Sequence, residues 1–339
     1  MHQTKTLPGL IDLQVNGYAG VDFNRLPLSV KDVKKVCRLL REEGVVGFLP
    51  TLITNAPDLT PTLAKIILNT TELYEPGIEA RILGLHLEGP FISPHPGARG
   101  AHPERWITKP DFDWVRRMQD IAEGKIQLMT LSPEWDGSAQ FIESVVGLGI
   151  RVAIGHTMAT LAQITEAVDA GATLSTHFGN GIPALVARHP NPIWSQMAEP
   201  RLWASVIGDG FHIPREVFEV VRVMKKDKVI LISDSTEFTG REPGQYDSPI
   251  GGHVVLTPEN RLHLAEDENL LAGSAMSLRQ IVNRLAKQNW ATFDDAWIMA
   301  SERPWRYLVE TGKPNNAPNR KPDREPDREP EYVEVVIDF

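Results

Sequence analysis

Short, nearly continuous runs of apolar residues recur along the first two thirds of the chain, each bounded by glycine, proline or polar residues. Strands buried on both faces have this composition, whereas strands with one solvated face alternate apolar and polar positions. Eight such runs precede residue 235, and we predict a strand at each: Leu10–Val15, Val45–Leu49, Arg81–Leu87, Ile126–Leu131, Arg151–Ile154, Thr173–Thr176, Leu202–Ile207 and Lys228–Ser233.

The segments between these runs are long enough for helices. Val30–Glu43 follows Ser29, a good N-cap residue, and helices are also predicted at Thr60–Tyr74 and at Leu161–Ala170, which precedes Gly171. Eight strands alternating with helices predict an α/β fold, the (β/α)₈ TIM-type barrel. A doubly wound open sheet is the alternative, but no G-x-G-x-x-G motif follows the first run.

The pattern changes after Asp234. Gly252–Leu256 and Arg261–Leu264 predict a hairpin, inserted near residues 250–265 of a barrel that spans residues 7–310, and helical patterns follow at Ser277–Lys287 and Phe293–Ala300. Residues 311–331 are rich in proline and charge and predict an extended linker. Residues 332–339 have strand composition, and the hairpin is a candidate partner for them in a small satellite sheet.

Composition narrows the functional classes. The net charge of −9 argues against binding to nucleic acid, which requires a basic surface. The longest apolar runs are too short for a membrane helix, and the first residues lack the apolar core of a secretory signal. The only cysteine, Cys37, lies in a helical pattern and is expected to be a buried core residue. A cytoplasmic protein fits these features.

Titratable residues follow five of the predicted strands. The carboxyl ends of barrel strands carry the functional side chains of this fold. A single histidine or aspartate in such a place is usually structural, for example a helix N-cap. A recurrence at five strand ends instead favours one metal site, because Glu/His/His with an open fourth position is a catalytic zinc arrangement that also accepts iron. The residues are Glu88, His156, His177, Asp209 with His212, and Asp234.

These residues lie in motifs that resemble the N-acetylglucosamine-6-phosphate deacetylase family of the amidohydrolase superfamily. The resemblance covers about residues 7–310, and the matching segments are Gly9–Gly17, Pro50–Thr54, Leu85–Phe91, Gly155–Thr157, Thr176–His177, Asp209–His212 and Ser233–Asp234. It implies hydrolysis of the acetamide of N-acetylglucosamine 6-phosphate to glucosamine 6-phosphate and acetate. Glu88, His156 and His177 would hold one divalent metal per chain, with zinc the first choice. Asp234 would act as the general base and then as the acid.

The resemblance also implies substrate contacts and a homodimer. Arg188 matches a phosphate-contacting arginine that in the family can reach the site of a neighbouring subunit, and His102 is expected to stabilise the oxyanion. The full set of candidate substrate contacts is Ala101, His102, Asn180, Gly181, Arg188, Asp209, His212, Leu271, Ala272 and Gly273.

The first predicted strand bears on the number of metals. Many amidohydrolases have His-x-His there and hold a second ion, whereas this chain has Gln14 and Asn16. Amide side chains are poor zinc ligands compared with imidazole. We therefore expect a single metal.

Other parts of the chain depart from the family pattern. The sequences at both ends of the chain differ from the family pattern, so the flanking β-sandwich is expected to be reduced or absent. The loop after His177 reads Asn180-Gly181-Ile182 in place of Asn-Ala-Met. Two alternatives to the phosphosugar substrate therefore stay open: a deacylase of another N-acyl sugar or amino acid, and a non-catalytic sugar-binding barrel. His86, two residues before Glu88, is either a partner of the metal ligands or a packed core histidine.

Overall fold

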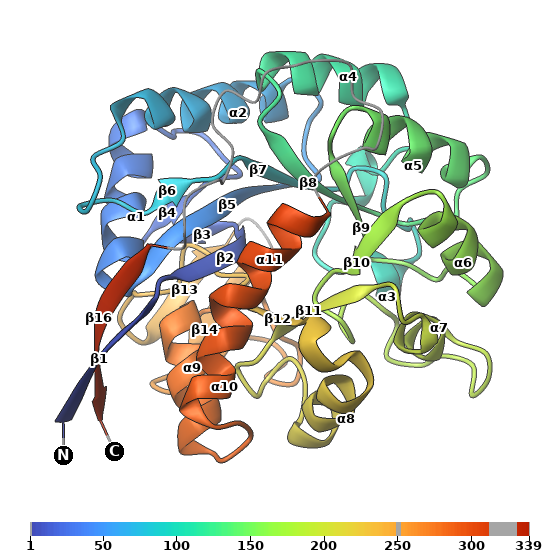
Figure 1. Ribbon diagram of the computed structural model, residues 1–339. Helices are drawn as coiled ribbons and strands as arrows, with labels where there is room; N and C mark the ends of the chain where they lie inside the picture. Colours follow the sequence, from blue (N-terminus) through green and yellow to red (C-terminus); the bar gives the residue numbers. More distant parts are fainter. Residues whose placement is uncertain (1, 249–251, 312–330, 339) are drawn as a thin grey trace.

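Eight parallel strands form a near-closed barrel in the computed structural model, which describes residues 2–248, 252–311 and 331–338 (Figure 1). Neighbouring strands follow chain order, as in a (β/α)₈ barrel. The strands are β2 (Leu10–Val15), β5 (Val45–Ile53), β7 (Leu85–Glu88), β8 (Ile126–Leu131), β9 (Arg151–Ile154), β10 (Ala172–Ser175), β11 (Trp203–Ile207) and β12 (Val229–Ile232).

The first and last strands are joined by hydrogen bonds from β2 and the residue after it to the residues that follow β12. The backbone N–H of Asn16 donates to the carbonyl of Ser235 (2.8 Å), and the N–H of Ser233 donates to Oδ1 of Asp12 (3.2 Å). These bonds close the ring of strands and bring the loops after β2 and β12 together.

All eight predicted strands are present, with one interruption. The third run is split into β6 (Arg81–Ile82) and β7 (Leu85–Glu88). Gly84 lies between them with φ +139°, and a Cβ there would stand 2.4 Å from the carbonyl oxygen of Lys125. Only glycine allows this close approach of β8, so the strand breaks at this point.

Helices cover the outside of the barrel (Figure 1). The helix predicted after Ser29 is confirmed, with a capping box formed by Ser29 and Asp32. The first helices are α1 (Val30–Glu42), α2 (Leu59–Asn69) continued by a 3₁₀ turn (Thr70–Leu73), α3 (Pro96–Arg99), α4 (Phe112–Ile121), α5 (Ser138–Gly147) and α6 (Leu161–Asp169). The remaining ones are α7 (Pro192–Ala198), α8 (Arg215–Lys225), α9 (Leu278–Lys287), α10 (Phe293–Ala300) and α11 (Glu302–Glu310), and no described helix is long and apolar enough to cross a bilayer.

The core has two main parts. One lies between the strands and the surrounding helices and contains Cys37, buried on α1 as expected. The other fills the barrel with apolar side chains such as Leu13 and Ile230 and is continued by Tyr307 of α11. The end of the barrel on which α11 packs is therefore filled by apolar side chains, and the polar chemistry is confined to the other end.

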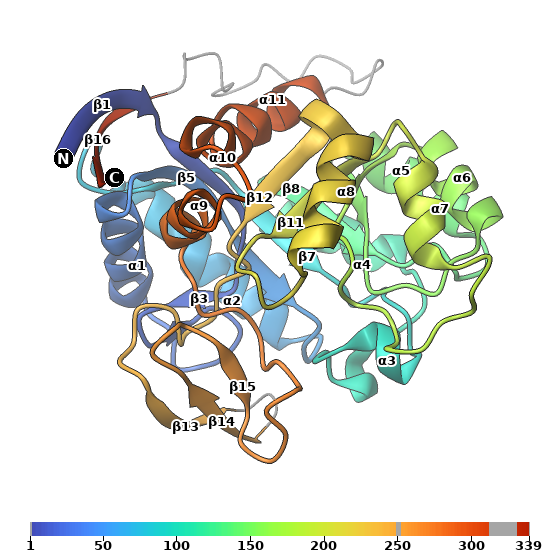
Figure 2. The same cartoon turned by 90° about the horizontal axis from the view of Figure 1, so that it is seen from below.

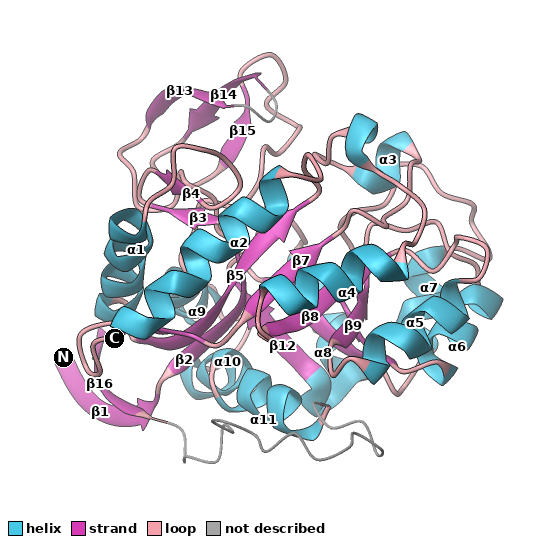
Figure 3. Cartoon of the chain, turned by 90° about the horizontal axis from the view of Figure 1, so that it is seen from above, coloured by secondary structure: helices cyan, strands magenta, loops and turns pink. Residues whose placement is uncertain are grey.

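The predicted hairpin has a third strand. β14 (Gly252–Leu256) and β15 (Leu262–Leu264) pair as expected, and β13 (Gly244–Ser248) pairs with β14. Figures 2 and 3 show this sheet standing beside the barrel, close to the short β3 (Gly17–Tyr18) and β4 (Val21–Asp22).

The candidate pairing of the C-terminal strand with this hairpin is wrong. β16 (Tyr332–Asp338) instead pairs antiparallel with β1 (His2–Pro8), so the two ends of the chain form a ribbon of their own (Figure 1). Val335 and Ile337 are buried against the rest of the protein, which fixes the register of the ribbon. The predicted linker falls almost wholly at residues 312–330, outside the described residues.

Candidate metal centre

The three predicted metal ligands converge at one end of the barrel. Glu88 is the last residue of β7, and His156 and His177 each lie two residues beyond their strands, β9 and β10. All three side chains are buried. The backbones of both histidines are left-handed, with φ +48° at His156 and +30° at His177. Non-glycine residues seldom adopt this conformation, and when they do they cluster at functional sites.

The ligand atoms lie close enough to share one cation. Nε2 of His177 is 2.8 Å and Nε2 of His156 is 3.2 Å from Oε1 of Glu88, and the two Nε2 atoms are 3.0 Å apart. Nδ1 of His156 donates to the carbonyl of Ala98 (2.9 Å), which leaves the lone pair of Nε2 facing the cluster. The donor set and its burial fit a divalent metal, and these are the described residues that group in this way.

The charge on Glu88 suits this role. Burial alone would raise the pKa of its carboxyl group, but the adjacent imidazoles of His156 and His177 outweigh burial and hold the pKa well below its usual range. Gln14 of β2 also donates its side-chain amide to Oε1 (3.1 Å). Gln14, which stands where many amidohydrolases have a histidine, thus helps to orient the carboxylate of Glu88.

Asp234 lies beyond β12 with φ +49°. Its Oδ1 accepts a hydrogen bond from Nδ2 of Asn16 (2.7 Å), the second amide of the first strand. Burial, aided by the nearby charge of Glu88, raises the pKa of Asp234 to about 6. A carboxyl group with a pKa near neutrality can take up a proton and release it again, which is what a general base and acid must do.

His102 is packed against the cluster. Its ring lies 4.4 Å from that of His156, centre to centre, and its Nδ1 is hydrogen-bonded to Oγ1 of Thr54 (2.9 Å). Burial and the neighbouring His156 lower the pKa of His102 to about 3. The imidazole is therefore neutral, and its Nε2, 3.9 Å from Oε2 of Glu88, faces the cluster.

Asp209 and His212 form a pair beyond β11. Oδ2 of Asp209 accepts from Nδ1 of His212 (2.7 Å), and Oδ1 accepts the backbone N–H groups of Phe211 and His212 (2.8 and 2.9 Å). Burial alone would lower the pKa of His212, but the carboxylate of Asp209 outweighs it and raises that pKa. Asp209 orients the imidazole and fixes its proton.

The loop after His177 packs over the cluster. Both N–H donors of Asn180, backbone and side chain, bond to the carbonyl of His177 (2.9 and 3.3 Å). Gly181 has φ +64° and approaches His156 so closely that a Cβ would stand 2.9 Å from its Nδ1. Asn180 and Gly181 therefore lie beside the cluster, and their contact with the substrate stays a prediction.

Two other candidates lie at the surface. Ala101 is exposed next to buried His102. Arg188 is exposed in the loop before α7, and its guanidinium makes no hydrogen bond or ion pair with the described residues. The phosphate contact of Arg188 stays a prediction. Its exposed side chain is free to reach the site of a second subunit.

The stretch Leu271–Gly273 runs beside the residues that follow Asp234. Leu271 bridges to His263 and the N–H of Ala272 donates to the carbonyl of Leu262 (3.1 Å), which ties the stretch to the hairpin sheet. Gly273 has φ +111°, and a Cβ there would stand 2.9 Å from Cγ2 of Thr236. The predicted substrate stretch thus flanks the loop that carries Asp234.

The structure also shows polar residues that the sequence pattern did not single out. Thr54 supports His102, and Glu134, which follows β8, accepts hydrogen bonds from several loops of the site. His86 is a core histidine, bonded to Oγ1 of Thr130 (2.8 Å), and burial lowers its pKa to about 4. Glu134 follows a predicted strand, as the metal ligands do, and that position was the signal that could have identified it.

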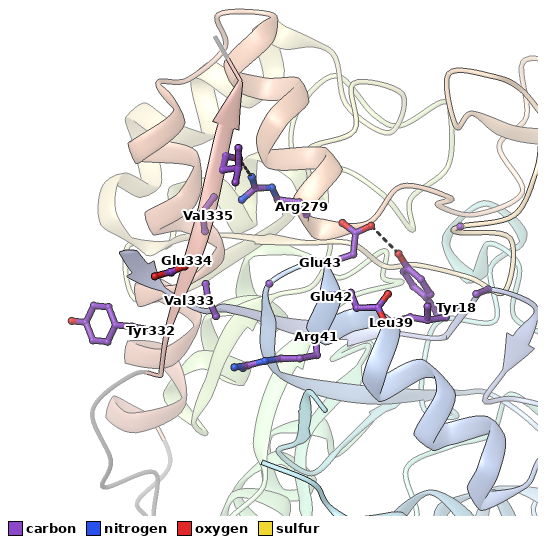
Figure 4. Close-up of a pocket in the computed structure, with 14 residues that line it drawn as sticks. Tyr18, Leu39, Arg41, Glu42, Glu43, Arg279, Tyr332, Val333, Glu334 and Val335 are labelled. Atoms are coloured by element: carbon purple, nitrogen blue, oxygen red, sulfur yellow. Dashed lines mark hydrogen bonds between the residues drawn. The ribbon is translucent and has the colours of Figure 1, made fainter. Parts of the chain in front are cut away.

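A cavity of about 880 Å³ lies away from the cluster (Figure 4). It is lined by the end of α1, the start of α9 and β16, where Nη2 of Arg279 donates to the carbonyl of Val336 (2.9 Å) and the hydroxyl of Tyr18 donates to the carboxylate of Glu43 (3.4 Å). Its lining mixes acidic and basic groups and contains none of the candidate site residues. This cavity is therefore separate from the candidate metal site at the barrel end.

Comparisons with known proteins agree with this reading. A scan of protein-family models finds no match. The chain is 30% identical over 309 residues to N-acetylglucosamine-6-phosphate deacetylase of Lysinibacillus sphaericus, covering 91% of this chain and 77% of that protein. It is 29% identical over 310 residues to N-acetylgalactosamine-6-phosphate deacetylase of Escherichia coli O157:H7, covering 90% and 78%.

A solved structure matches over the same region. It is a variant of N-acetyl-D-glucosamine-6-phosphate deacetylase from Mycobacterium smegmatis in complex with N-acetyl-D-glucosamine-6-phosphate. The TM-score is 0.76 at 25% sequence identity, and the match covers 90% of this chain and 78% of the other. With the buried Glu/His/His cluster at the carboxyl ends of a parallel barrel, these matches show that the chain belongs to the N-acetylglucosamine-6-phosphate deacetylase family of the amidohydrolase superfamily.

Proposed function

We propose that the protein removes the acetyl group of an N-acetylhexosamine 6-phosphate, with N-acetylglucosamine 6-phosphate as the first candidate substrate. The observation that carries the proposal is the buried cluster of Glu88, His156 and His177 at the barrel end that also bears Asp234. The relative from Escherichia coli O157:H7 is named for the galactosamine epimer, so N-acetylgalactosamine 6-phosphate is the second candidate.

Each side chain then has a chemical task. Glu88, His156 and His177 would hold a divalent ion, and such an ion would lower the pKa of a water to about 7 and polarise the amide carbonyl. Asp234 takes the proton from the attacking water and passes it to the departing amine nitrogen, so that acetate and the amino sugar leave. Asn16 keeps the Asp234 carboxylate in place through its 2.7 Å hydrogen bond. His102, neutral and facing the cluster, would donate to the oxyanion.

The rest of the site would recognise the sugar phosphate. Asn180 and Gly181, over the cluster, are proposed to contact the sugar, together with His212 and Leu271–Gly273. Arg188 is proposed to bind the phosphate, for which a guanidinium fork is well suited. Its exposure on the single chain fits a site completed in a homodimer. The homodimer, zinc as the native metal and the cytoplasmic location stay predictions.

The test is acetate release from four compounds: the two N-acetylhexosamine 6-phosphates and their unphosphorylated forms. We expect turnover of at least one phosphorylated compound, with kcat/KM about tenfold or more above its unphosphorylated form, since a charge-assisted phosphate contact contributes about 1.5–3 kcal/mol. Arg188→Ala should narrow this difference by raising KM for the phosphorylated compound. Equal rates with and without phosphate would contradict the phosphosugar assignment, and no acetate from any compound would contradict the activity.

A further inference from the structure

Glu134 lies in the loop between β8 and α5 and collects hydrogen bonds from three loops of the barrel end. Its Oε1 accepts from Oγ of Ser93 (2.7 Å). Its Oε2 accepts from Oγ of Ser132 (2.9 Å), from Oγ1 of Thr157 (3.3 Å) and from the backbone N–H of Met158 (2.7 Å). Ser93 donates to Oε1 and the N–H of Met158 donates to Oε2, so both oxygens of Glu134 act as acceptors. The hydroxyls of Ser132 and Thr157 also lie 2.7 Å from each other, where either can be the donor.

Two of these loops carry metal ligands. Ser93 belongs to the loop that follows Glu88, and Thr157 and Met158 directly follow His156. The backbone N–H of Ser93 also donates to the carbonyl of His156 (2.9 Å), so the two loops are bonded to each other as well as to Glu134. The relative position of Glu88 and His156 is thus fixed by bonds that converge on one carboxylate.

His156 requires such restraint. Its φ of +48° is unfavourable for a residue with a β-carbon and persists only where the surroundings enforce it. The bonds from Ser93 to its carbonyl and from Met158 to Glu134 hold the backbone that directly follows this residue. Released from them, His156 would relax and carry Nε2 away from Oε1 of Glu88.

We infer that Glu134 is a positioning residue of the metal centre, which holds the His156 loop against the Glu88 loop and so sets the affinity for the ion. The inference rests on the proposed function only in requiring that the cluster binds a metal. Glu134 acts through Ser93, Thr157 and Met158, and its bonds are to these groups and to Ser132.

The test measures metal binding and not only turnover. Zn²⁺ affinity of the metal-free full chain is determined by competition with a chromogenic chelator, for the wild type and for Glu134→Gln. The side-chain NH₂ group of glutamine would face a group that donates to Glu134, so that hydrogen bond would be lost. The Zn²⁺ affinity should therefore fall roughly 10- to 100-fold, as when outer-shell partners of metal ligands are lost. Activity of Glu134→Gln should rise toward the wild-type level in excess Zn²⁺, a rescue that a misfolded protein would not show.

A matched control separates positioning from general loss of stability. Glu79 is a buried carboxylate outside the metal cluster, paired with Lys34 (3.2 Å) and Arg38 (3.3 Å) of α1. Glu79→Gln should keep the wild-type Zn²⁺ affinity even where its midpoint of thermal unfolding falls. If Glu134→Gln does not fold, Ser93→Ala takes its place, because it removes one donor to Glu134 and should weaken Zn²⁺ binding in the same direction by a smaller factor.

Wild-type Zn²⁺ affinity in the folded Glu134 variant, or in Ser93→Ala when that variant decides, would overturn the inference. So would an equal loss in Glu79→Gln. A wild-type chain that binds Zn²⁺ but releases no acetate would overturn the proposed activity alone, because the affinity comparison would still stand. A wild-type chain that binds no divalent ion would overturn both.

Discussion

Asp12 is a buried carboxyl group at the seam where β2 meets the end of β12. Its side chain is 1% exposed, and Oδ1 accepts the backbone N–H groups of Ser233 (3.2 Å) and Gln14 (3.3 Å). Burial is the main reason that its pKa is raised from 3.8 to about 7, and the charge of Asp234 adds to the rise. The barrel therefore closes around a carboxyl group that is more stable with its proton on.

This shift makes the free energy of unfolding depend on pH. Between pH 3.8 and about 7 the folded chain keeps the Asp12 proton that the unfolded chain has released, so stability from this group is complete at low pH and falls as the pH rises through that window. At about 1.4 kcal/mol for each pH unit, the loss amounts to about 4 kcal/mol by pH 7.

Asp12→Asn should abolish this dependence. Asparagine keeps an oxygen that accepts the two N–H groups and cannot ionise, so the variant should match the wild type near pH 4 and exceed its stability by up to about 4 kcal/mol above pH 7. The assay is urea unfolding of the metal-free chain from pH 4 to 8. Asp58→Asn removes an exposed carboxylate that makes no N-cap bond and serves as the charge-matched control. A stability difference that does not grow with pH, or that grows equally in Asp58→Asn, would refute the reasoning.

Three further outcomes are expected. Asp234→Asn should bind metal as the wild type does but lose roughly 10²- to 10⁴-fold in kcat for acetate release, and near-normal turnover would contradict its role. Removal of metal with a chelator should abolish acetate release and Zn²⁺ should restore it; activity that survives exhaustive chelation would argue against a metal enzyme. Gly181→Ala should weaken Zn²⁺ binding, because its Cβ would stand 2.9 Å from Nδ1 of His156. Gly149→Ala, with φ +80° and no atom within 4 Å of the added Cβ, should lower thermal stability alone, and equal metal affinity in the two variants would contradict the proposed contact.

The barrel could be predicted because its strands are buried on both faces. Runs such as Arg151–Ile154 need no partner to be recognised, since their composition alone distinguishes them. The same regularity placed Glu88, His156 and His177 at the site, because parallel strands deliver the residues after them to one end.

The ribbon of β1 and β16 could not be predicted in the same way. β1 reads His2–Pro8, mostly polar, and becomes a strand only because it pairs with a segment at the other end of the chain. β13 is likewise polar and exists through its pairing with β14. A strand that depends on a distant partner carries little signal in its own residues.

The support around the metal ligands was also beyond the sequence pattern. The bond from Nδ1 of His156 to the carbonyl of Ala98, and the convergence of three loops on Glu134, depend on how loops fold over one another. Backbone carbonyls and serine hydroxyls have no characteristic spacing, so although the position of Glu134 after a strand was a signal, its bonds to the other loops appear only in the structure. The ligands were predictable and what holds them was not.

A metal titration of the metal-free enzyme tests the central claim most directly. Zn²⁺ is added in substoichiometric steps, and acetate release from N-acetylglucosamine 6-phosphate is measured beside the bound metal. With Glu88, His156 and His177 as ligands and Gln14 and Asn16 on the first strand, activity should rise linearly and reach its plateau at one equivalent per chain. A plateau at two equivalents, or full activity of the chain before any metal is bound, would contradict the single-metal site.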